Sequence, residues 1–547
     1  MVMKKFYLLM LMAMAGSSQT YAQWNTNATP KCIYSTTYVD QSTGETKTGG
    51  DYYACSPKVA RTTDGKTWLA WKTWGKKVMD GTRVDAVRTY LQLLDRDGVP
   101  QFEEPIMVND HITPSYWSEC ALCVAADGSA IVTVADSRTQ DDTYVDDGYS
   151  PQTFTPAIYK IDQEGNFLWG LDGIDFRDYH DSPFTNAYVV GDDTYFLFNS
   201  GSVGDEDTDG IYMIRIADDG TLLWDAPRKM ASGMTTKGQV LPTTDGDFLY
   251  FDDTPDGARV HRFDSDLNEV WGEALVYDDH YFGGYEMNHY RIVPDGMGGA
   301  CVAFQRFMGT FSHNIRVQHI YEDGSLGFGL EGLDAYNADA YDHNYPSIAA
   351  CPETEEILVQ YASELSGTGN VMHQKFSYDG DYLYDELGMS IASKSTATNT
   401  YMFGLPKTGV GSLPDGSWIA VYRDIASYNN ESIVIRRYDK DGNRVWTRTI
   451  GRNLNVNDLA IIVEPEAAYL FWREASSDKN PGITIFRIAA DGTYNVTEPE
   501  GIVSTDDNTE PVVESVYSLD GKQLRQPQHG LNVVRYSDGS VEKRVVR

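Results

Sequence analysis

An all-β fold made of eight copies of one unit is what this 547-residue sequence predicts. A short acidic turn followed by an aromatic residue recurs along the chain, as in "DKDGNRVW" (439–446). A second hairpin signal lies upstream of the turn within the unit, and no long amphipathic helix follows the N-terminal segment. These three observations favour repeated β-hairpins over any helical or mixed fold.

The acidic turn recurs most clearly in "IDQEGNFLW", "IADDGTLLW" and "FDSDLNEVW", which end at Trp169, Trp224 and Trp271. Weaker copies end at Phe102, Phe328, Tyr384 and Val496, so seven of the eight copies end in an aromatic residue. The turn positions are Gly98, Gly165, Gly220, Leu267, Gly324, Gly380, Gly442 and Gly492. They are 47 to 67 residues apart, a spacing typical of repeat architectures.

The upstream hairpin is visible in "VAADGSAIVTVAD" (124–136), "VPDGMGGACVAF" (293–304) and "SLPDGSWIAVY" (412–422). Asp-Gly supplies the positive φ that hairpin turns need. Each unit therefore holds four strands, and eight units predict an eight-bladed β-propeller over residues 51–503. A run of β-sandwiches is the alternative, which the even spacing and the lack of linkers disfavour.

The acidic turn could also begin a calcium loop, with Asp439 and Asp441 as ligands. Calcium loops need five or more oxygen ligands and usually a bidentate Glu downstream. The copies keep the turn position and the aromatic residue but not a fixed set of carboxylates. We therefore predict exposed hairpin turns, with the tryptophans at 169, 224, 271 and 446 buried between blades.

The segments "EGNFLW", "DGTLLW" and "DGNRVW" resemble the tryptophan-docking motif of eight-bladed quinoprotein-type propellers. The resemblance implies the fold and says little about chemistry. Quinoprotein dehydrogenases use a vicinal disulfide beside their cofactor, whereas no two cysteines are adjacent in this chain. Cys120 and Cys123 are followed by Val124, so the haem-attachment signal is also missing. No cofactor is predicted.

The two ends of the chain predict export. Residues 1–22 have the pattern of a signal peptide, with Lys4 and Lys5 before an apolar core too short to span a membrane. Residues 23–50 are expected to pack on the ring or close it. After a polar linker (504–511), residues 512–547 resemble the C-terminal sorting tail of proteins exported by the type IX secretion system of Bacteroidetes.

That resemblance rests on "VYSLDGKQL", "GLNVVRYSDG" and the basic end "KRVVR". It implies a small β-unit, a partner in the secretion machinery, and an extracytoplasmic protein that is secreted or held at the outer-membrane surface. The alternative is a small β-appendage that packs on the propeller.

Composition limits the classes of partner. The formal charge is −36, and −38 without Lys4 and Lys5, so the surface repels nucleic acid and anionic lipid. Six cysteines are too few for a disulfide scaffold, although Cys32 and Cys55 could pair. No later segment is apolar enough to predict a membrane span.

The loops that lead into the innermost strands (109–119, 178–184, 280–290 and 340–347) hold five of the ten histidines. Aromatic rings beside hydrogen-bonding side chains at a concave mouth suit a sugar. The predicted ligand-binding residues are Trp117, Tyr179, His180, His289, Tyr290, Asp342, His343 and Tyr345. The alternative is that these residues only cap the ends of the blades.

Signals for catalysis are weaker. With 80 carboxylates no acid–base pair can be singled out, and the sequence contains no GxSxG, HExxH or P-loop motif. No catalytic residue and no metal ligand is predicted. The sequence favours a non-catalytic binding module for a glycan, peptide or protein partner. The alternatives are a carbohydrate-active propeller enzyme with carboxylates at the channel mouth and, less favoured, a scaffold subunit of a cell-envelope assembly.

Overall fold

The structure, a computed structural model of the whole chain, contains two compact units, Met1–Asn495 and Val496–Arg547. All regular elements of the described residues are strands, and none of these residues forms a helix long and apolar enough to cross a membrane. The structure describes residues 24–26, 28–35, 37–39, 46–48, 57–79, 82–109, 111, 120–138, 154–179, 184–201, 209–232, 239–254, 257–277, 290–309, 312–338, 342–365, 368–393, 408–427, 430–454, 456–474, 482–494, 513–518, 523–524, 530–536 and 541–546.

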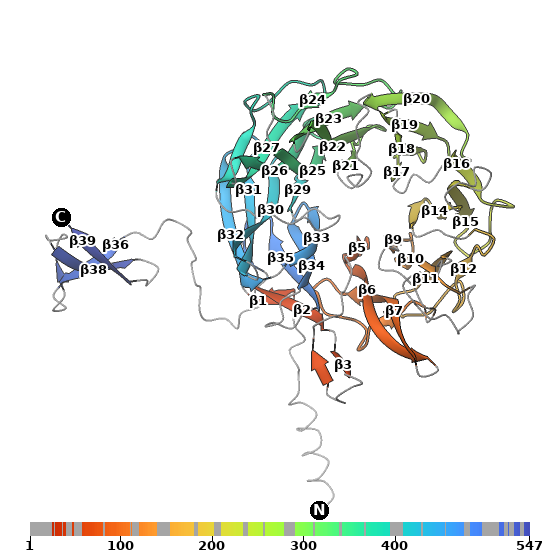
Figure 1. Cartoon of the computed structure of the whole chain (residues 1–547), viewed down its shortest axis with the longest axis horizontal. Helices are drawn as coiled ribbons and strands as arrows, with labels where there is room; N and C mark the ends of the chain where they lie inside the picture. The colour runs from red at the N-terminus through yellow and green to blue at the C-terminus, as the bar shows by residue number, and fades with distance from the viewer. Residues whose placement is uncertain are drawn as a thin grey trace, which may run out of the picture. The chain divides into compact units, whose positions relative to one another are not determined.

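The first unit is an eight-bladed β-propeller, which confirms the predicted fold class. Eight antiparallel blades follow one another around a ring, each with four strands except the last, which gains a short fifth strand from the N-terminal segment (Figure 1). Blades 1 and 2 consist of β5 (Lys58–Arg61), β6 (Thr67–Met79), β7 (Thr82–Leu94), β8 (Ile106–Met107), β9 (Ala121–Val124), β10 (Ala130–Asp136), β11 (Thr155–Ile161) and β12 (Ile174–Asp175). Blades 3 and 4 consist of β13 (Thr185–Val190), β14 (Asp193–Ser200), β15 (Gly210–Ile216), β16 (Arg228–Ser232), β17 (Gln239–Pro242), β18 (Phe248–Thr254), β19 (Gly257–Phe263) and β20 (Glu269–Tyr277).

The second half of the ring repeats this order. Blades 5 and 6 consist of β21 (Tyr290–Pro294), β22 (Ala300–Gly309), β23 (Ser312–Ile320), β24 (Leu333–Asp334), β25 (Asp342–Cys351), β26 (Glu356–Leu365), β27 (Thr368–Ser377) and β28 (Met389–Ser393). Blade 7 and the first three strands of blade 8 are β29 (Thr408–Ser412), β30 (Trp418–Ser427), β31 (Asn430–Tyr438), β32 (Arg444–Leu454), β33 (Val456–Glu464), β34 (Ala467–Glu474) and β35 (Gly482–Ala489).

The N-terminal segment completes blade 8. β2 (Thr29–Ser35) pairs antiparallel with β35, and β1 (Asn25–Thr26) pairs with β2, so the first strands of the unit lie beside the last (Figure 1). A short hairpin of β3 (Thr37–Val39) and β4 (Thr46–Thr48) follows. Cys32, within β2, is a free thiol, and Cys55 lies outside the described residues.

The acidic turns are hairpins between the third and fourth strands of blades 1 to 7, and in blade 8 the turn follows the third strand, β35. Gly442 has φ +85°, and Leu267, which replaces glycine in blade 4, keeps the same left-handed backbone with φ +59°. The Asp439 carboxylate accepts hydrogen bonds from the main-chain N–H groups of Asp441 and Asn443. This carboxylate therefore serves the turn itself, as the hairpin interpretation requires.

Each aromatic residue that follows a turn packs on the turn of the next blade. A Cβ at Gly220 would lie 2.8 Å from the Trp169 ring, so only glycine fits there. The indole N–H of Trp169 donates to the carbonyl of Asp218, two residues before that glycine. Trp169, Trp224 and Trp446 are buried as predicted. Trp271 is only partly buried, so the prediction was wrong for that copy.

The eighth aromatic position is taken by a residue that the repeat did not reveal. Trp24 is fully buried and lies against Gly98 of blade 1. Its indole N–H donates to the Arg96 carbonyl over 2.8 Å, the same contact that Trp169 makes. Trp24 thus replaces the missing aromatic at Val496, because the outer strand of blade 8 comes from the N-terminus.

A basic residue five positions before the turn position forms a second repeat. In blades 2 to 7 it pairs with an acidic residue of the first hairpin of its own blade, for example Lys160 with Asp127 at 2.9 Å and Arg437 with Asp415 at 2.9 Å, and in blade 8 the Arg487 guanidinium lies over the Tyr469 ring. Several of these cations also donate to the main-chain carbonyl that receives the indole, as Arg437 does to Ala490 at 3.0 Å. The seven residues are Lys160, Arg215, Arg262, His319, Lys375, Arg437 and Arg487.

The second unit is a small four-stranded antiparallel sheet with strand order β37-β36-β38-β39. Its strands are β36 (Val513–Ser518), β37 (Gln523–Leu524), β38 (Gly530–Tyr536) and β39 (Val541–Val546).

Candidate functional site

Only part of the predicted ligand site lies among the described residues. Trp117, His180 and His289 fall outside them. Tyr290 and Asp342 begin β21 and β25, but their side chains are not described. The side chains of Tyr179, His343 and Tyr345 are described and are considered in turn.

His343 is buried, with 1% of its surface exposed, so its expected place on an open face was wrong. Its Nδ1 lies 3.1 Å from the Asn314 Oδ1, and its ring packs edge-on against Tyr336 and Tyr361. The reason is that β25 already begins at Asp342, which places His343 inside the paired strand and between blades 5 and 6.

Tyr345 lies in an irregular part of β25, where the register with β26 shifts between Asn344 and Ser347. Its φ of +58° is unusual for a residue with a side chain, and the ring is half-buried. The Gln305 amide donates to Asn344 Oδ1 at 2.7 Å, which ties this irregular segment to blade 5.

Tyr179 lies at the junction of blades 2 and 3. Its ring packs edge-on against Phe198 and Tyr212, with centroids 5.4 and 5.0 Å away. It is half-buried, and burial raises the pKa of its hydroxyl. Tyr179 therefore keeps part of its surface available at the end of the strands that carries the interblade loops.

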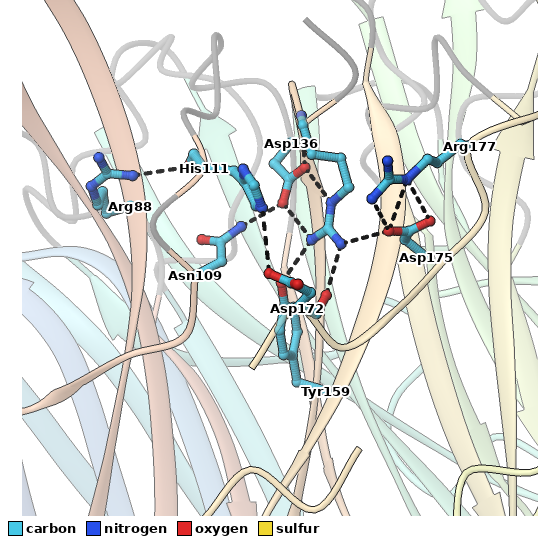
Figure 2. Close-up of polar contacts among 9 residues, drawn as sticks. Arg88, Asn109, His111, Asp136, Tyr159, Asp172, Asp175 and Arg177 are labelled. Atoms are coloured by element: carbon cyan, nitrogen blue, oxygen red, sulfur yellow. Dashed lines mark hydrogen bonds and ion pairs between the residues drawn. The ribbon is translucent and has the colours of Figure 1, made fainter. Parts of the chain in front are cut away.

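The chain just before Tyr179 takes part in a polar network of side chains at this end of the ring (Figure 2). The centre of this network is Arg138, whose side chain is fully buried directly after β10. All five guanidinium N–H groups are used: Nε and one Nη2 donor bind the Asp136 carboxylate, and the other Nη2 donor binds the Tyr159 hydroxyl. The Nη1 donors bind the Asp172 carbonyl and the Asp175 carboxylate.

The loop between blades 1 and 2 joins this network. The Asn109 amide donates to Asp136 at 2.5 Å, and Arg88 donates to the His111 carbonyl at 2.9 Å. The His111 Nε2 lies 4.0 Å from the Asp172 carboxylate. Loops from two blades are thus fixed against each other by side chains.

Exposure separates the network into a base and a rim. The side chains of Asp136 and Arg138 are fully buried, whereas those of Asp172, Arg177 and His111 are 84%, 61% and 34% exposed. The rim offers an imidazole, a carboxylate and a guanidinium to solvent (Figure 2), and Arg177 lies two residues before the half-buried Tyr179 in the chain. Such a set can donate and accept hydrogen bonds next to an aromatic surface.

The charges in the base are held in place. Burial opposes the positive charge of Arg138, but the hydrogen bonds and charge of Asp136 outweigh it and raise the pKa of the guanidinium. Burial also raises the pKa of Asp175, but hydrogen bonds from Arg177 and Arg138 outweigh it, so the pKa is lowered overall. Both groups therefore remain ionised at neutral pH, which suits a rigid support and does not suit proton transfer.

Sequence reasoning missed this network because it concentrated on histidines and aromatic rings. The signal in the sequence is the pair Asp136 and Arg138 directly after an apolar strand. Nothing in one sequence shows that Tyr159 and Asp175 complete it. Among the described residues, no group of three or more His, Cys, Asp or Glu side chains is arranged to hold a metal ion.

Comparison with known proteins adds no family: no family model matches the sequence, and no curated protein matches it. Among solved structures, the chain is similar to an ulvan lyase of a polysaccharide lyase family, at 10% identity and a TM-score of 0.41 over 86% of this chain and 96% of that one. It is also similar to Sqt1 from Chaetomium thermophilum, at 11% identity and a TM-score of 0.40 over 80% and 98%.

A prolyl endopeptidase matches at 11% identity and a TM-score of 0.36 over 73% of this chain, which spans half of that enzyme's length. These weak likenesses identify no activity for this chain.

Proposed function

We propose that the chain is a secreted or cell-surface β-propeller that binds a glycan, peptide or protein partner without catalysis. The observation that carries the proposal is the rim of His111, Asp172 and Arg177 on a buried base of Asp136 and Arg138, all five of whose guanidinium N–H groups are hydrogen-bonded. A base whose charges neutralise each other fixes the rim before a ligand arrives, which lowers the entropy cost of binding. The loop residues Trp117, His180, His289, Tyr290, Asp342 and Tyr345 are proposed to extend the same ligand site.

Acid–base catalysis is less well supported at this network. A glycosidase-type general acid needs a raised pKa. Among the described residues, each carboxyl group whose pKa departs clearly from its ordinary value has a lowered pKa. Of these groups, Asp175 belongs to the network around Arg138, and its lowered pKa favours binding over the carbohydrate-active enzyme as the function of the described rim.

The test begins with glycan and peptide arrays probed with the mature protein, followed by calorimetry on each hit. His111→Ala and Arg177→Ala should each weaken binding by about tenfold, as expected for the loss of a hydrogen bond to a charged group. Lys440→Ala, which removes an exposed cation from a turn of blade 7, is the matched control and should bind like the wild type. If both rim variants bound the array hits with unchanged affinity, the rim would not be the ligand site. If the protein released a product from a bound glycan, it would be an enzyme instead of a binding module.

The export proposal has a separate test. Residues 512–547 belong to a compact unit of their own, so deleting them should leave the melting temperature of the propeller unchanged. We propose that the deletion retains the protein in the periplasm, because the tail addresses it to the type IX machinery. Normal delivery of the truncated chain to the surface or medium would contradict the sorting role.

A further inference from the structure

A cavity of about 710 Å³ lies at the junction of blades 4 and 5. It is formed by the hairpin turns of the two blades, at the opposite ends of the strands from the interblade loops. Two exposed aliphatic side chains line it, Val270 at 50% and Met297 at 44% exposure. The partly exposed Trp271 lies beside them, and the remaining lining residues are mostly charged.

Trp271 differs from Trp224 and Trp446, the equivalent tryptophans of blades 3 and 7. The guanidinium of Arg228 lies over the Trp224 ring at 4.2 Å, and that of Arg448 lies over Trp446 at 5.9 Å. Among the described side chains, no cation lies over Trp271, although its indole N–H still donates to the next blade at 3.0 Å. An arginine of the chain thus covers the rings of Trp224 and Trp446, whereas the ring of Trp271 lines the cavity.

The charge of the cavity also favours a cation as its ligand. Five carboxylates line it and only one guanidinium, that of Arg262. Arg262 is 3% exposed and already paired with Asp245 and Asp247 at 2.5 and 2.8 Å. The buried carboxylate of Asp295 is paired with a histidine.

Two carboxylates of the lining project into solvent. Glu322 is 65% exposed, and Asp323 is exposed on the adjoining turn. Glu322 forms one long ion pair, 3.9 Å to Arg262, whose guanidinium is already shared between Asp245 and Asp247, and no ion pair joins Asp323 to a described side chain. The rim of the cavity thus carries negative charge beside an aromatic ring.

We propose that this cavity binds an arginine side chain of a basic peptide from a partner protein, with the guanidinium over Trp271 and beside Glu322 and Asp323. Cations are attracted to the face of tryptophan, and the aliphatic stem of arginine can pack on Val270 and Met297. The net charge of −36 draws basic segments toward the surface. The site is separate from the proposed rim of blades 1 to 3.

The test mixes the full chain with a fluorescently labelled peptide that has one arginine between two leucines. Binding of the peptide is measured by fluorescence anisotropy at low salt. The control peptide carries citrulline, which keeps the shape of arginine without its charge. The arginine peptide should bind saturably and the citrulline peptide at least tenfold more weakly. Raising the salt to about 0.5 M should weaken the arginine peptide as exposed charges are screened.

Protein variants locate the binding. Glu322→Gln combined with Asp323→Asn keeps the acceptor oxygens of the turn and should weaken the arginine peptide about tenfold, for the loss of two exposed charge contacts. Asp219→Asn makes the change equivalent to Asp323→Asn in the blade 3 turn that faces the buried Trp169, and it should bind like the wild type. Equal binding of both peptides, an unchanged double variant, or displacement by a neutral oligosaccharide would overturn the proposal.

Discussion

Replacing Trp24 with alanine removes the aromatic contact that closes the ring. The side chain is fully buried, and its ring lies 5.0 Å from Tyr469 and 5.8 Å from Phe471. A buried tryptophan hides about 150–250 Å² of surface, which at about 25 cal/mol per Å² corresponds to about 4–6 kcal/mol. Measured Trp→Ala changes in cores cost about 3–5 kcal/mol, and we expect a value in that range.

The assay is urea unfolding followed by circular dichroism, together with limited proteolysis of the N-terminal strand. Because a chain of this size need not unfold in one step, the readout is the midpoint of the first transition. Trp24→Phe is the control, since it keeps a ring against Gly98 and loses the 2.8 Å hydrogen bond to Arg96, at a cost of about 1 kcal/mol. A midpoint in Trp24→Ala equal to that of the control would show that the ring closes without this contact.

Three further predictions concern the turns. Gly220→Ala should lower the free energy of unfolding by about 2–4 kcal/mol, because the backbone is left-handed and the new methyl group would meet the Trp169 ring. Gly191→Ala, whose new methyl group would have no atom within 4 Å, should lower it by about 1–2 kcal/mol, and thermal unfolding measures both values. Burial raises the pKa of Asp295, but hydrogen bonds from His319 and from two main-chain N–H groups outweigh it, so the pKa is lowered. The stabilising effect of this carboxylate is therefore present above its unfolded pKa of about 4 and is lost as the pH falls through the lowered pKa, and Asp295→Asn should flatten the fall in melting temperature below about pH 4. Asp441→Asn should leave the melting temperature unchanged with or without calcium, and a calcium-dependent stabilisation abolished by this change would contradict the hairpin assignment.

The propeller could be predicted because its repeated signal is local. A turn that needs a positive φ selects glycine wherever it occurs, and Leu267 shows that the geometry persists even where the glycine is lost. Trp24 could not be assigned in this way, because its position in blade 8 depends on a strand contributed from the other end of the chain. Trp271 has the same motif as Trp224, but its exposure depends on neighbours that the motif does not contain.

The candidate site was predicted less well for a related reason. Residue types identified the interblade loops, but strand boundaries decide which side chains face solvent, and His343 lies inside β25. The network around Arg138 draws on residues from β10 to β12 and from the preceding blade, so no single segment shows it.

The arrangement of the blade contacts explains why function can lie at the loop end of the ring. The indole contacts, the repeated cation pairs and the glycine turns all fix the blades at the end that carries the hairpin turns. The loop between β10 and β11 can therefore occupy residues 137–154 while that between β18 and β19 occupies only 255–256, with four-stranded blades preserved in both cases. Loops that do not hold the blades together can change in length and side chains at little cost in stability. Where such a loop is nevertheless fastened, as Asn109 and His111 are, the side chains that fasten it are the first to consider as support for a bound ligand.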